Sequence, residues 1–328
     1  MNGFKLRLRT AAFVLILALS SSLALPCSAL FRHGHPADSP SGSLPSNYPP
    51  AARHQELTTY RNVAVTGTLE AVDPEGEVVS FQLTGHPARG SVSLREDGSG
   101  AFVYTPYENK TGRDSFTFVA VDPSGAVSAK ARVSIRIIRP DTRVTYLDLS
   151  GHPAHKAAIH LAEKEIFVGE QVGGHWFFDP DRPVTRARFL TMAENSVKGK
   201  NSTAVMLTGF HDDEAIPVWA KPAVSAALKE GIITGSKTEY GAPVFRPEQV
   251  ITCGEASVML NKLLNLPDVP AEVFYPAPGD HWALQAAANL TAAGLFQELV
   301  GGASLSQPLT MGDAAQLLDA ALTFMDER

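Results

Sequence analysis

The chain has little cysteine: only Cys27 and Cys253 among its 328 residues. Small exported domains that lack a large core usually depend on disulfides, which need cysteines in pairs. If residues 1–29 are removed on export, as argued below, Cys253 remains alone. We therefore expect no internal disulfide, and the folded parts must be held together by core packing. The length is sufficient for two or three domains.

Long apolar runs are also missing. The strongest run, Ala11 to Leu25, is short for a membrane-spanning helix, which needs roughly 20 residues. Three basic residues precede it and Ser28-Ala29 follow it, the order found in a secretory signal peptide. We predict a signal peptide over residues 1–29, with an uncleaved membrane anchor as the alternative. Lipid attachment at Cys27 is a further alternative, although Pro26 before it matches a lipoprotein signal poorly.

The chain has no excess of positive charge. Its formal charge is −6, and loss of the three basic residues of the signal region makes it −9. Nucleic acids and anionic lipid surfaces attract basic proteins. We therefore predict neither of them as a partner.

Catalytic signatures are absent from the sequence. There is no H-E-x-x-H zinc motif, no G-x-S-x-G nucleophile turn and no phosphate-binding glycine loop. No pair of carboxylates stands in a recognisable glycosidase setting. We predict that the protein is not an enzyme, with no catalytic residue, no cofactor and no resident metal.

The part that follows the signal region is rich in proline. Residues 30–56 contain five prolines among serine, glycine and alanine. Such a segment cannot bury enough apolar surface to order itself, so we predict a flexible spacer. His33 and His35 lie within it, but two ligands on a flexible tether do not make a metal site.

Residues 57–140 alternate apolar and polar side chains with a period of two, most regularly over 132–137. Turn clusters interrupt the alternation, and they are Asp73-Pro74-Glu75-Gly76, Asp97-Gly98-Ser99-Gly100 and Asp122-Pro123-Ser124-Gly125. Six or seven short strands at this spacing predict an all-β, antiparallel sandwich.

The run from Val103-Tyr104-Thr105-Pro106 to Gly112-Arg113-Asp114-Ser115-Phe116-Thr117-Phe118 resembles a bacterial immunoglobulin-like or cadherin-like repeat. The resemblance covers about 80 residues and implies an immunoglobulin-like sandwich with a protein or glycan ligand. Some relatives bind calcium between tandem copies through clustered acids. This chain has one copy, and we interpret its acids as turn formers, with a calcium site as the alternative; these acids are Asp73, Glu75, Glu77 and Asp122.

From residue 144 to the end the apolar period changes to 3.6, which is typical of helices. Three segments repeat the same order of features, each predicted as helix, loop and helix, and they cover residues 144–199, 208–266 and 272–328. Gly231 and Gly294 stand where a helix ends and a positive φ is wanted.

A threonine recurs before the second helix of each segment, at 185, 252 and 310. Its hydroxyl can accept an unpaired backbone N–H at the start of the helix. Glu255 and Asp313, three residues further on, predict capping boxes. The first segment has Arg188 in that position, so Thr185 is expected to cap alone.

The three segments together resemble the S-layer homology domain, over residues 144–328. The features that carry the resemblance are the Trp219-Ala220 start, the Gly231-Ile232-Ile233-Thr234-Gly235 turn, the Phe245-Arg246-Pro247 loop and the threonine motif. The resemblance implies an all-α unit of three repeats with approximate threefold symmetry. It also implies non-covalent binding of cell-wall polysaccharides, which often carry pyruvate groups.

The family motif implies that Arg186 binds such a carboxylate, because its planar guanidinium can donate two parallel hydrogen bonds. Cys253 and Met311 replace this arginine in the other repeats, so we expect one dominant site. The alternative is that Arg186 is an ordinary solvated residue.

Two further pairs complete the predicted site. Trp219 and Trp282 match the family tryptophan and can stack on a sugar ring, whereas the first repeat has Ala154 there. The alternative is that they anchor helices in the core. Asp148 and Asp212 match the early aspartate of the family and can accept hydrogen bonds from hydroxyls, or else cap loops.

We therefore predict an immunoglobulin-like sandwich followed by three helix-loop-helix repeats, in a secreted protein held at the cell surface by wall polysaccharide. The alternative is a secreted ligand-binding or adhesion protein whose repeats have lost affinity for the wall.

Overall fold

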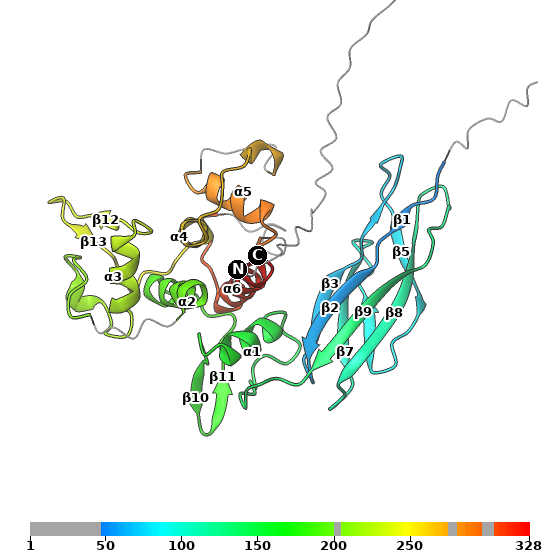
Figure 1. The fold of residues 1–328 in the computed structure, drawn as a ribbon, viewed down its shortest axis with the longest axis horizontal. Helices are drawn as coiled ribbons and strands as arrows, with labels where there is room; N and C mark the ends of the chain where they lie inside the picture. Colours follow the sequence, from blue (N-terminus) through cyan, green and yellow to red (C-terminus); the bar gives the residue numbers. More distant parts are fainter. Residues whose placement is uncertain (1–46, 200–204, 275–280, 297–304) are drawn as a thin grey trace, which may run out of the picture. The chain divides into compact units, whose positions relative to one another are not determined.

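The structure, a computed structural model, describes residues 47–199, 205–274, 281–296 and 305–328 (Figure 1). The predicted signal peptide and residues 30–46 of the predicted spacer lie outside these ranges. Within them, no helix combines the length and the apolar character needed to cross a membrane.

Residues 51–138 form the predicted sandwich. Its strands are β1 (Ala51–Ala52), β2 (Gln55–Tyr60), β3 (Val65–Thr68), β4 (Ala71–Val72), β5 (Ser80–Gly85), β6 (Gly90–Leu94), β7 (Ala101–Pro106), β8 (Gly112–Val121) and β9 (Ala131–Ile138). One sheet has the order β2-β9-β8-β5 and another β3-β7-β6, while β1 pairs with β4. The β2–β9 pair is parallel, so the prediction of a purely antiparallel sandwich is wrong at this pair.

The sandwich core follows from the period of two. Alternate residues of β9 are buried, namely Ala131, Val133, Ile135 and Ile137. They share a core with Phe102 and Tyr104 of β7 and with Phe116 and Phe118 of β8. The rings of Phe102 and Phe116 pack edge to face with centroids 5.2 Å apart.

The sandwich begins earlier than predicted. Residues 51–52 and 55–56, placed in the spacer from composition, belong to β1 and β2. The partner of β2 is β9, in the register Gln55 to Val133. The residues that pair are far apart in the sequence, so the pairing is not visible in the local pattern. The local pattern before β2 is dominated by prolines, which favoured the interpretation as a spacer.

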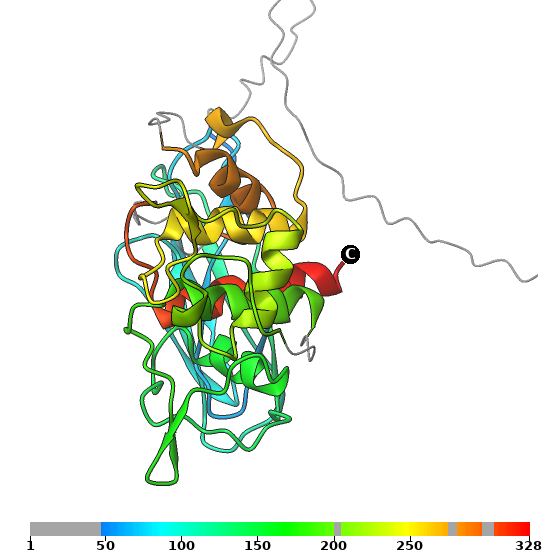
Figure 2. The same ribbon diagram turned by 90° about the vertical axis from the view of Figure 1, so that its left-hand side faces the viewer.

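The described part of the second half contains three pairs of α-helices. They are α1 (His155–Glu163) and α2 (Arg186–Lys198), α3 (Lys221–Lys229) and α4 (Cys253–Leu264), and α5 (Leu284–Ala292) and α6 (Met311–Asp326). Each predicted segment thus contributes two helices. Two short hairpins, β10 (Glu170–Val172) with β11 (His175–Phe177) and β12 (Ser236–Lys237) with β13 (Pro243–Val244), lie in the loops. This half is therefore helical but not all-α, and the β10–β11 hairpin projects from the helices (Figures 1 and 2).

The helices begin and end at the capping residues that the sequence predicts. Thr185 accepts a hydrogen bond from Arg188 N–H and caps α2 alone, whereas Thr252 and Thr310 form complete capping boxes. Gly231 and Gly294 follow the ends of α3 and α5 with φ of 71° and 76°, the left-handed conformation that glycine adopts without strain.

The loops before the second helices are joined in a closed ring of backbone hydrogen bonds. Val184 N–H donates to Leu309, Leu309 N–H to Ile251, and Ile251 N–H to Val184, each at 2.9 Å. The first N–H of α2, α4 and α6 donates in the same way to the loop of another segment, with acceptors Gln249, Gln307 and Arg182. These donors have no partner inside their own helices, so the ring satisfies them.

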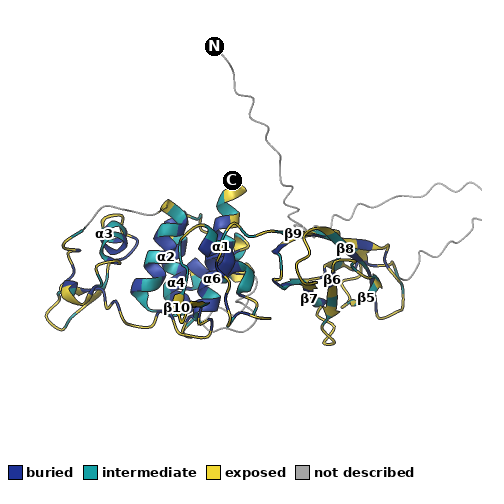
Figure 3. Cartoon of the chain, turned by 90° about the horizontal axis from the view of Figure 1, so that it is seen from below, coloured by how far each residue is buried: buried dark blue, intermediate teal, exposed yellow. Residues whose placement is uncertain are grey.

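The helices pack in a matching order. The first helix of each pair contacts the second helix of another pair, α1 with α6, α3 with α2 and α5 with α4. Their apolar faces are turned toward one another, and the exposed residues lie outside (Figure 3).

Candidate functional site

Arg186 is the first residue of α2 and its side chain crosses to the second segment. Its Nη1 donates to Glu255 Oε1 at 2.8 Å and its Nε to the carbonyl oxygen of Phe245 at 3.1 Å. The guanidinium also lies over the Phe245 ring, 5.4 Å from the centroid. Only 12% of the side chain is exposed. Burial lowers the pKa of Arg186 from its ordinary value, and the charge of Glu255 opposes that shift. The structure thus places the predicted carboxylate-binding arginine in an ion pair between two segments.

Asp148 and Asp212 have the same role in the first two segments. Asp148 accepts the N–H groups of Phe178 and Asp179 at 2.9 and 2.7 Å. Asp212 accepts those of Phe245 and Arg246 at 2.8 and 2.7 Å. Both carboxylates therefore bind backbone N–H groups of the F-x-P loop. This is the loop-capping role, which was the predicted alternative to binding hydroxyl groups.

Trp219 and Trp282 are exposed, at 52% and 65%. The alternative that they anchor helices in the core is therefore wrong. The buried N-cap residues Ala154, Ala220 and Ala283 correspond to one another. The first segment consequently has Pro153, and not Ala154, in the tryptophan position.

Trp219 lines a cavity of about 220 Å³ where the segments meet. Polar side chains of the first segment line it, among them Glu170, Arg182 and Arg188. Glu248 of the second segment and Met311 at the start of α6 line it as well. Arg186 and the two predicted aspartates are not among the lining residues. Sequence analysis did not predict Arg182 or Arg188 as site residues.

Arg188 occupies the position that Glu255 and Asp313 use to close their capping boxes. Its guanidinium carbon lies 5.4 Å from the centroid of the Phe167 ring. No carboxylate in the described ranges lies within ion-pair distance of it. Arg182, by contrast, contacts Glu170 at 3.4 Å and Asp179 at 3.9 Å. Arg188 is therefore the cation of this cavity whose N–H groups remain available, and its signal in the sequence was the interrupted capping box.

Trp219 also lines a second cavity, of about 550 Å³, together with residues of α2 and α3. Glu194, Asn195, Lys198 and Glu230 line it. Lys198 Nζ lies 3.3 Å from Glu194 and also pairs with Glu230. Burial raises the pKa of Glu194. The exposed indole thus lines two cavities that both contain charged side chains.

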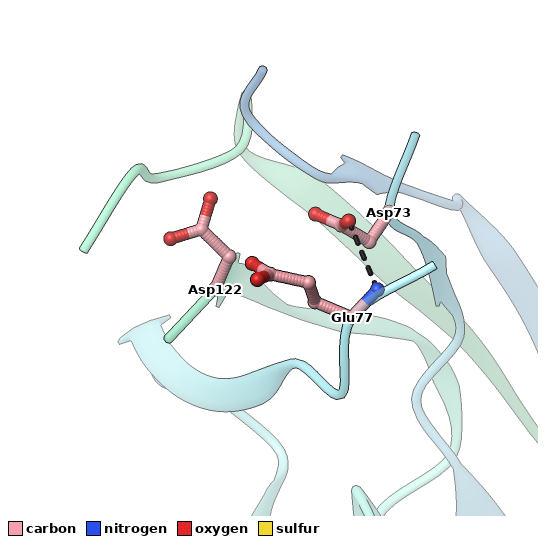
Figure 4. Close-up of side chains that lie close together, drawn as sticks. All are labelled: Asp73, Glu77 and Asp122. Carbon is pink, nitrogen blue, oxygen red and sulfur yellow. Dashed lines mark hydrogen bonds between the residues drawn. The ribbon is translucent and has the colours of Figure 1, made fainter. Parts of the chain in front are cut away.

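A separate cluster of carboxylates lies at one end of the sandwich (Figure 4). Asp73, Glu77 and Asp122 each bring one carboxylate oxygen within 4.8 Å of the others. Asp73 Oδ1 accepts the N–H groups of Glu75 and Glu77 at 2.9 and 3.1 Å, as a turn former does. Asp122 accepts from Ala126 N–H and from the amide of Asn47, at 2.8 and 2.7 Å.

This cluster has the donor set that calcium prefers, since all its ligand atoms are oxygens and calcium takes six to eight of them. Asp73 and Asp122 are only 7% and 4% exposed. The Oδ2 atom of Asp73 is buried and has no hydrogen-bond partner. A buried carboxylate oxygen without a partner is costly unless a cation approaches it. The residues present therefore fit a calcium ion.

Comparison with known families places two domains on this chain. Residues 47–139 match the model of the bacterial cadherin-like domain, and residues 209–257 match that of the S-layer homology domain. The second match falls on the second of the three segments. An S-layer homology domain indicates attachment at the cell surface, and a cadherin-like domain indicates a surface module. No curated protein matches the chain.

Solved structures resemble only part of the chain. An endo-fucoidan hydrolase of glycoside hydrolase family 107 is 20% identical, with 30% of this chain and 14% of that chain covered and a TM-score of 0.25. A mutant of the SrpA adhesin from Streptococcus sanguinis is 19% identical, with 31% of this chain and 65% of that chain covered and a TM-score of 0.23. Fibronectin(III)-like modules of CbhA from Clostridium thermocellum are 18% identical, with 30% of this chain and 51% of that chain covered and a TM-score of 0.19. Because the TM-scores are this low, these structures carry no argument about function.

Proposed function

We propose that this is an exported, non-enzymatic surface protein that attaches to cell-wall polysaccharide through the groove beside Trp219. This groove is the cavity that Trp219 and Arg188 both line. The observation that carries the proposal is the combination of an exposed indole with Arg188 in one cavity. The cadherin-like domain would be the module that the anchored protein displays, with a protein or glycan as its ligand.

The three helix pairs, in this proposal, form one unit with approximate threefold symmetry. The closed ring through Val184, Ile251 and Leu309 supports it. The cyclic packing of α1 on α6, α3 on α2 and α5 on α4 supports it as well. Such an arrangement would place a groove at each of three boundaries, with different side chains in each.

The groove at Trp219 has the chemistry that a sugar needs. The indole presents a flat apolar face, which can stack on a pyranose ring. Arg188 can donate two parallel hydrogen bonds to a carboxylate such as a pyruvyl group. Glu170 and Glu248 can accept hydrogen bonds from hydroxyl groups. Because these carboxylates offset the arginines, recognition here would depend on geometry more than on net charge.

Arg186 has a positioning role in this proposal. Its ion pair with Glu255 joins α2 to α4, and α2 carries Arg188 two residues later. The expected dominant site therefore remains at the first segment, with Arg188 in place of Arg186 as the group that contacts the carboxylate.

The proposal is tested by sedimentation of the mature chain with purified cell walls. The wild type should sediment with the walls, and Trp219→Ala and Arg188→Gln should remain mostly in solution. Arg246→Gln removes an exposed arginine outside the lining of the Trp219 cavity and is the matched control. A wild-type protein that stays in solution would instead favour the secreted adhesion protein.

A second function, calcium binding by the sandwich, is favoured by the buried Oδ2 of Asp73. Asp73, Glu77 and Asp122 would hold the ion, which would supply positive charge to three carboxylates. Binding to the folded state alone raises stability. Calcium would thus stabilise the displayed module, and terbium luminescence or calorimetry with the mature chain can test it.

A further inference from the structure

Three arginines lie together where β2 and β9 end. The two strands run parallel and finish at Tyr60 and Ile138, which are paired in register. Arg61 N–H then donates to the carbonyl oxygen of Ile138 at 2.8 Å, so Arg61 and Arg139 leave the sheet side by side. Arg143 follows four residues later. All three line one open cavity of about 830 Å³.

Two arginines of the sandwich, Arg53 and Arg95, have carboxylate partners that these three arginines lack among the described residues. Arg53 lies 3.7 Å from Glu70 and Arg95 lies 3.7 Å from Asp97. In the described part of the chain, no carboxylate lies within ion-pair distance of Arg61, Arg139 or Arg143. The Nε atom of Arg61 is also buried without a hydrogen-bond partner. Asp141 lines the same cavity, so the lining carries two more positive than negative charges.

Clustered positive charge is unusual in a chain whose formal charge is −6. Like charges in one cavity repel one another, and a buried N–H without an acceptor costs free energy. An oxyanion would offset both effects, because each guanidinium can donate two hydrogen bonds to carboxylate or phosphate oxygens. The cavity is therefore complementary to a group with several negatively charged oxygens.

We propose that Arg61, Arg139 and Arg143 form an oxyanion site that binds the acidic groups of an anionic polysaccharide. Naming a polysaccharide as the source of the oxyanion rests on the proposed wall attachment. The site itself is independent of it and shares no residue with the groove at Trp219. Two separate contacts on one polymer would raise the overall affinity by increasing the effective concentration at the second site.

The test uses the mature full chain and two probes, inorganic triphosphate and a galacturonic acid trimer, in titration calorimetry at low salt. The variant R61Q/R139Q/R143Q should bind both probes at least about tenfold more weakly than the wild type. The control R53Q/R95Q/R132Q changes the net charge equally but alters no residue that lines the cavity, and it should bind nearly as the wild type does. Binding should weaken as salt increases, because exposed charges are screened.

The proposal is overturned if the two triple variants lose affinity equally, since net charge alone would then explain binding. Binding of triphosphate without binding of the galacturonate trimer would overturn the assignment to a polysaccharide in favour of free phosphate. If R61Q prevents folding, R139Q/R143Q is the second variant, because both side chains are exposed. Triphosphate has no sugar ring to stack on an indole, so its titration reports on this site separately from the proposed wall groove at Trp219.

Discussion

Arg186 Nη1 and Glu255 Oε1 lie 2.8 Å apart, although 69 residues separate them in the sequence. The pair joins the first residue of α2 to the third residue of α4. It also uses the glutamate that closes the capping box at Thr252. One carboxylate therefore stabilises both a helix start and the contact between two segments.

Loss of this pair should destabilise the helical half. Arg186→Ala leaves Glu255 without its cation in a largely buried position, which we expect to lower the free energy of unfolding by about 3 kcal/mol. The double variant R186M/E255Q removes both charges and should recover much of that loss. Denaturant unfolding of the wild type, R186M, E255Q and R186M/E255Q, the four proteins of the double-mutant cycle, measures the coupling. Equal stability of wild type and Arg186→Ala would show that the pair contributes nothing.

Asp213 should make stability depend on pH. It is buried and contacts Lys221 Nζ at 2.5 Å. The hydrogen bonds from Lys221 and then Thr208 lower the pKa of Asp213 from 3.8 to about 2. Since the folded state holds the carboxylate ionised, its stabilisation is full above about pH 4 and is lost as the pH falls toward 2.

Asp213→Asn should therefore have a lower Tm than the wild type at pH 7, and the two Tm values should converge between pH 4 and pH 2. Asp326→Asn, which changes an acid near the C-terminus, is the control. A Tm difference that stays constant down to pH 2 would contradict the assigned cause.

Calcium should raise the Tm of the sandwich. A hundredfold excess over Kd stabilises the folded state by about 2.7 kcal/mol if the unfolded chain does not bind. Asp73→Asn should remove most of this increase, because Asp73 supplies the buried oxygen without a partner. Glu75→Gln changes an acid outside the cluster and should keep the increase. Differential scanning calorimetry with and without calcium makes the comparison, and an unchanged wild-type Tm would rule out the site.

Features that depend on neighbours in sequence could be predicted. The threonine caps, the glycines after α3 and α5 and the alternation in β9 depend on residues within one turn or strand. The family resemblance likewise located the exposed tryptophans, although it aligned Ala154 where Pro153 stands.

Features that depend on distant partners could not be predicted. The parallel pairing of β2 with β9 and the acceptor of Arg186 involve residues about 70 or more positions away. Without knowledge of these partners, Arg186 was interpreted as a cation free to bind a ligand. Arg188 was seen only as the residue that prevents a complete capping box at Thr185. The same limit applied to the acids at 73 and 122, whose burial depends on two loops meeting.

In the proposed function, Trp219 and Arg188 bind the wall, whereas Arg186 only positions α2. The most direct test is the Kd for purified walls, measured by sedimentation at equilibrium with R188Q and with the charge-free pair R186M/E255Q. We predict about a tenfold or greater loss of affinity for R188Q, as expected when a charge-assisted contact is removed, and nearly unchanged affinity for R186M/E255Q. Wild-type affinity in R188Q together with lost binding in R186M/E255Q would contradict this account and return the ligand contact to Arg186.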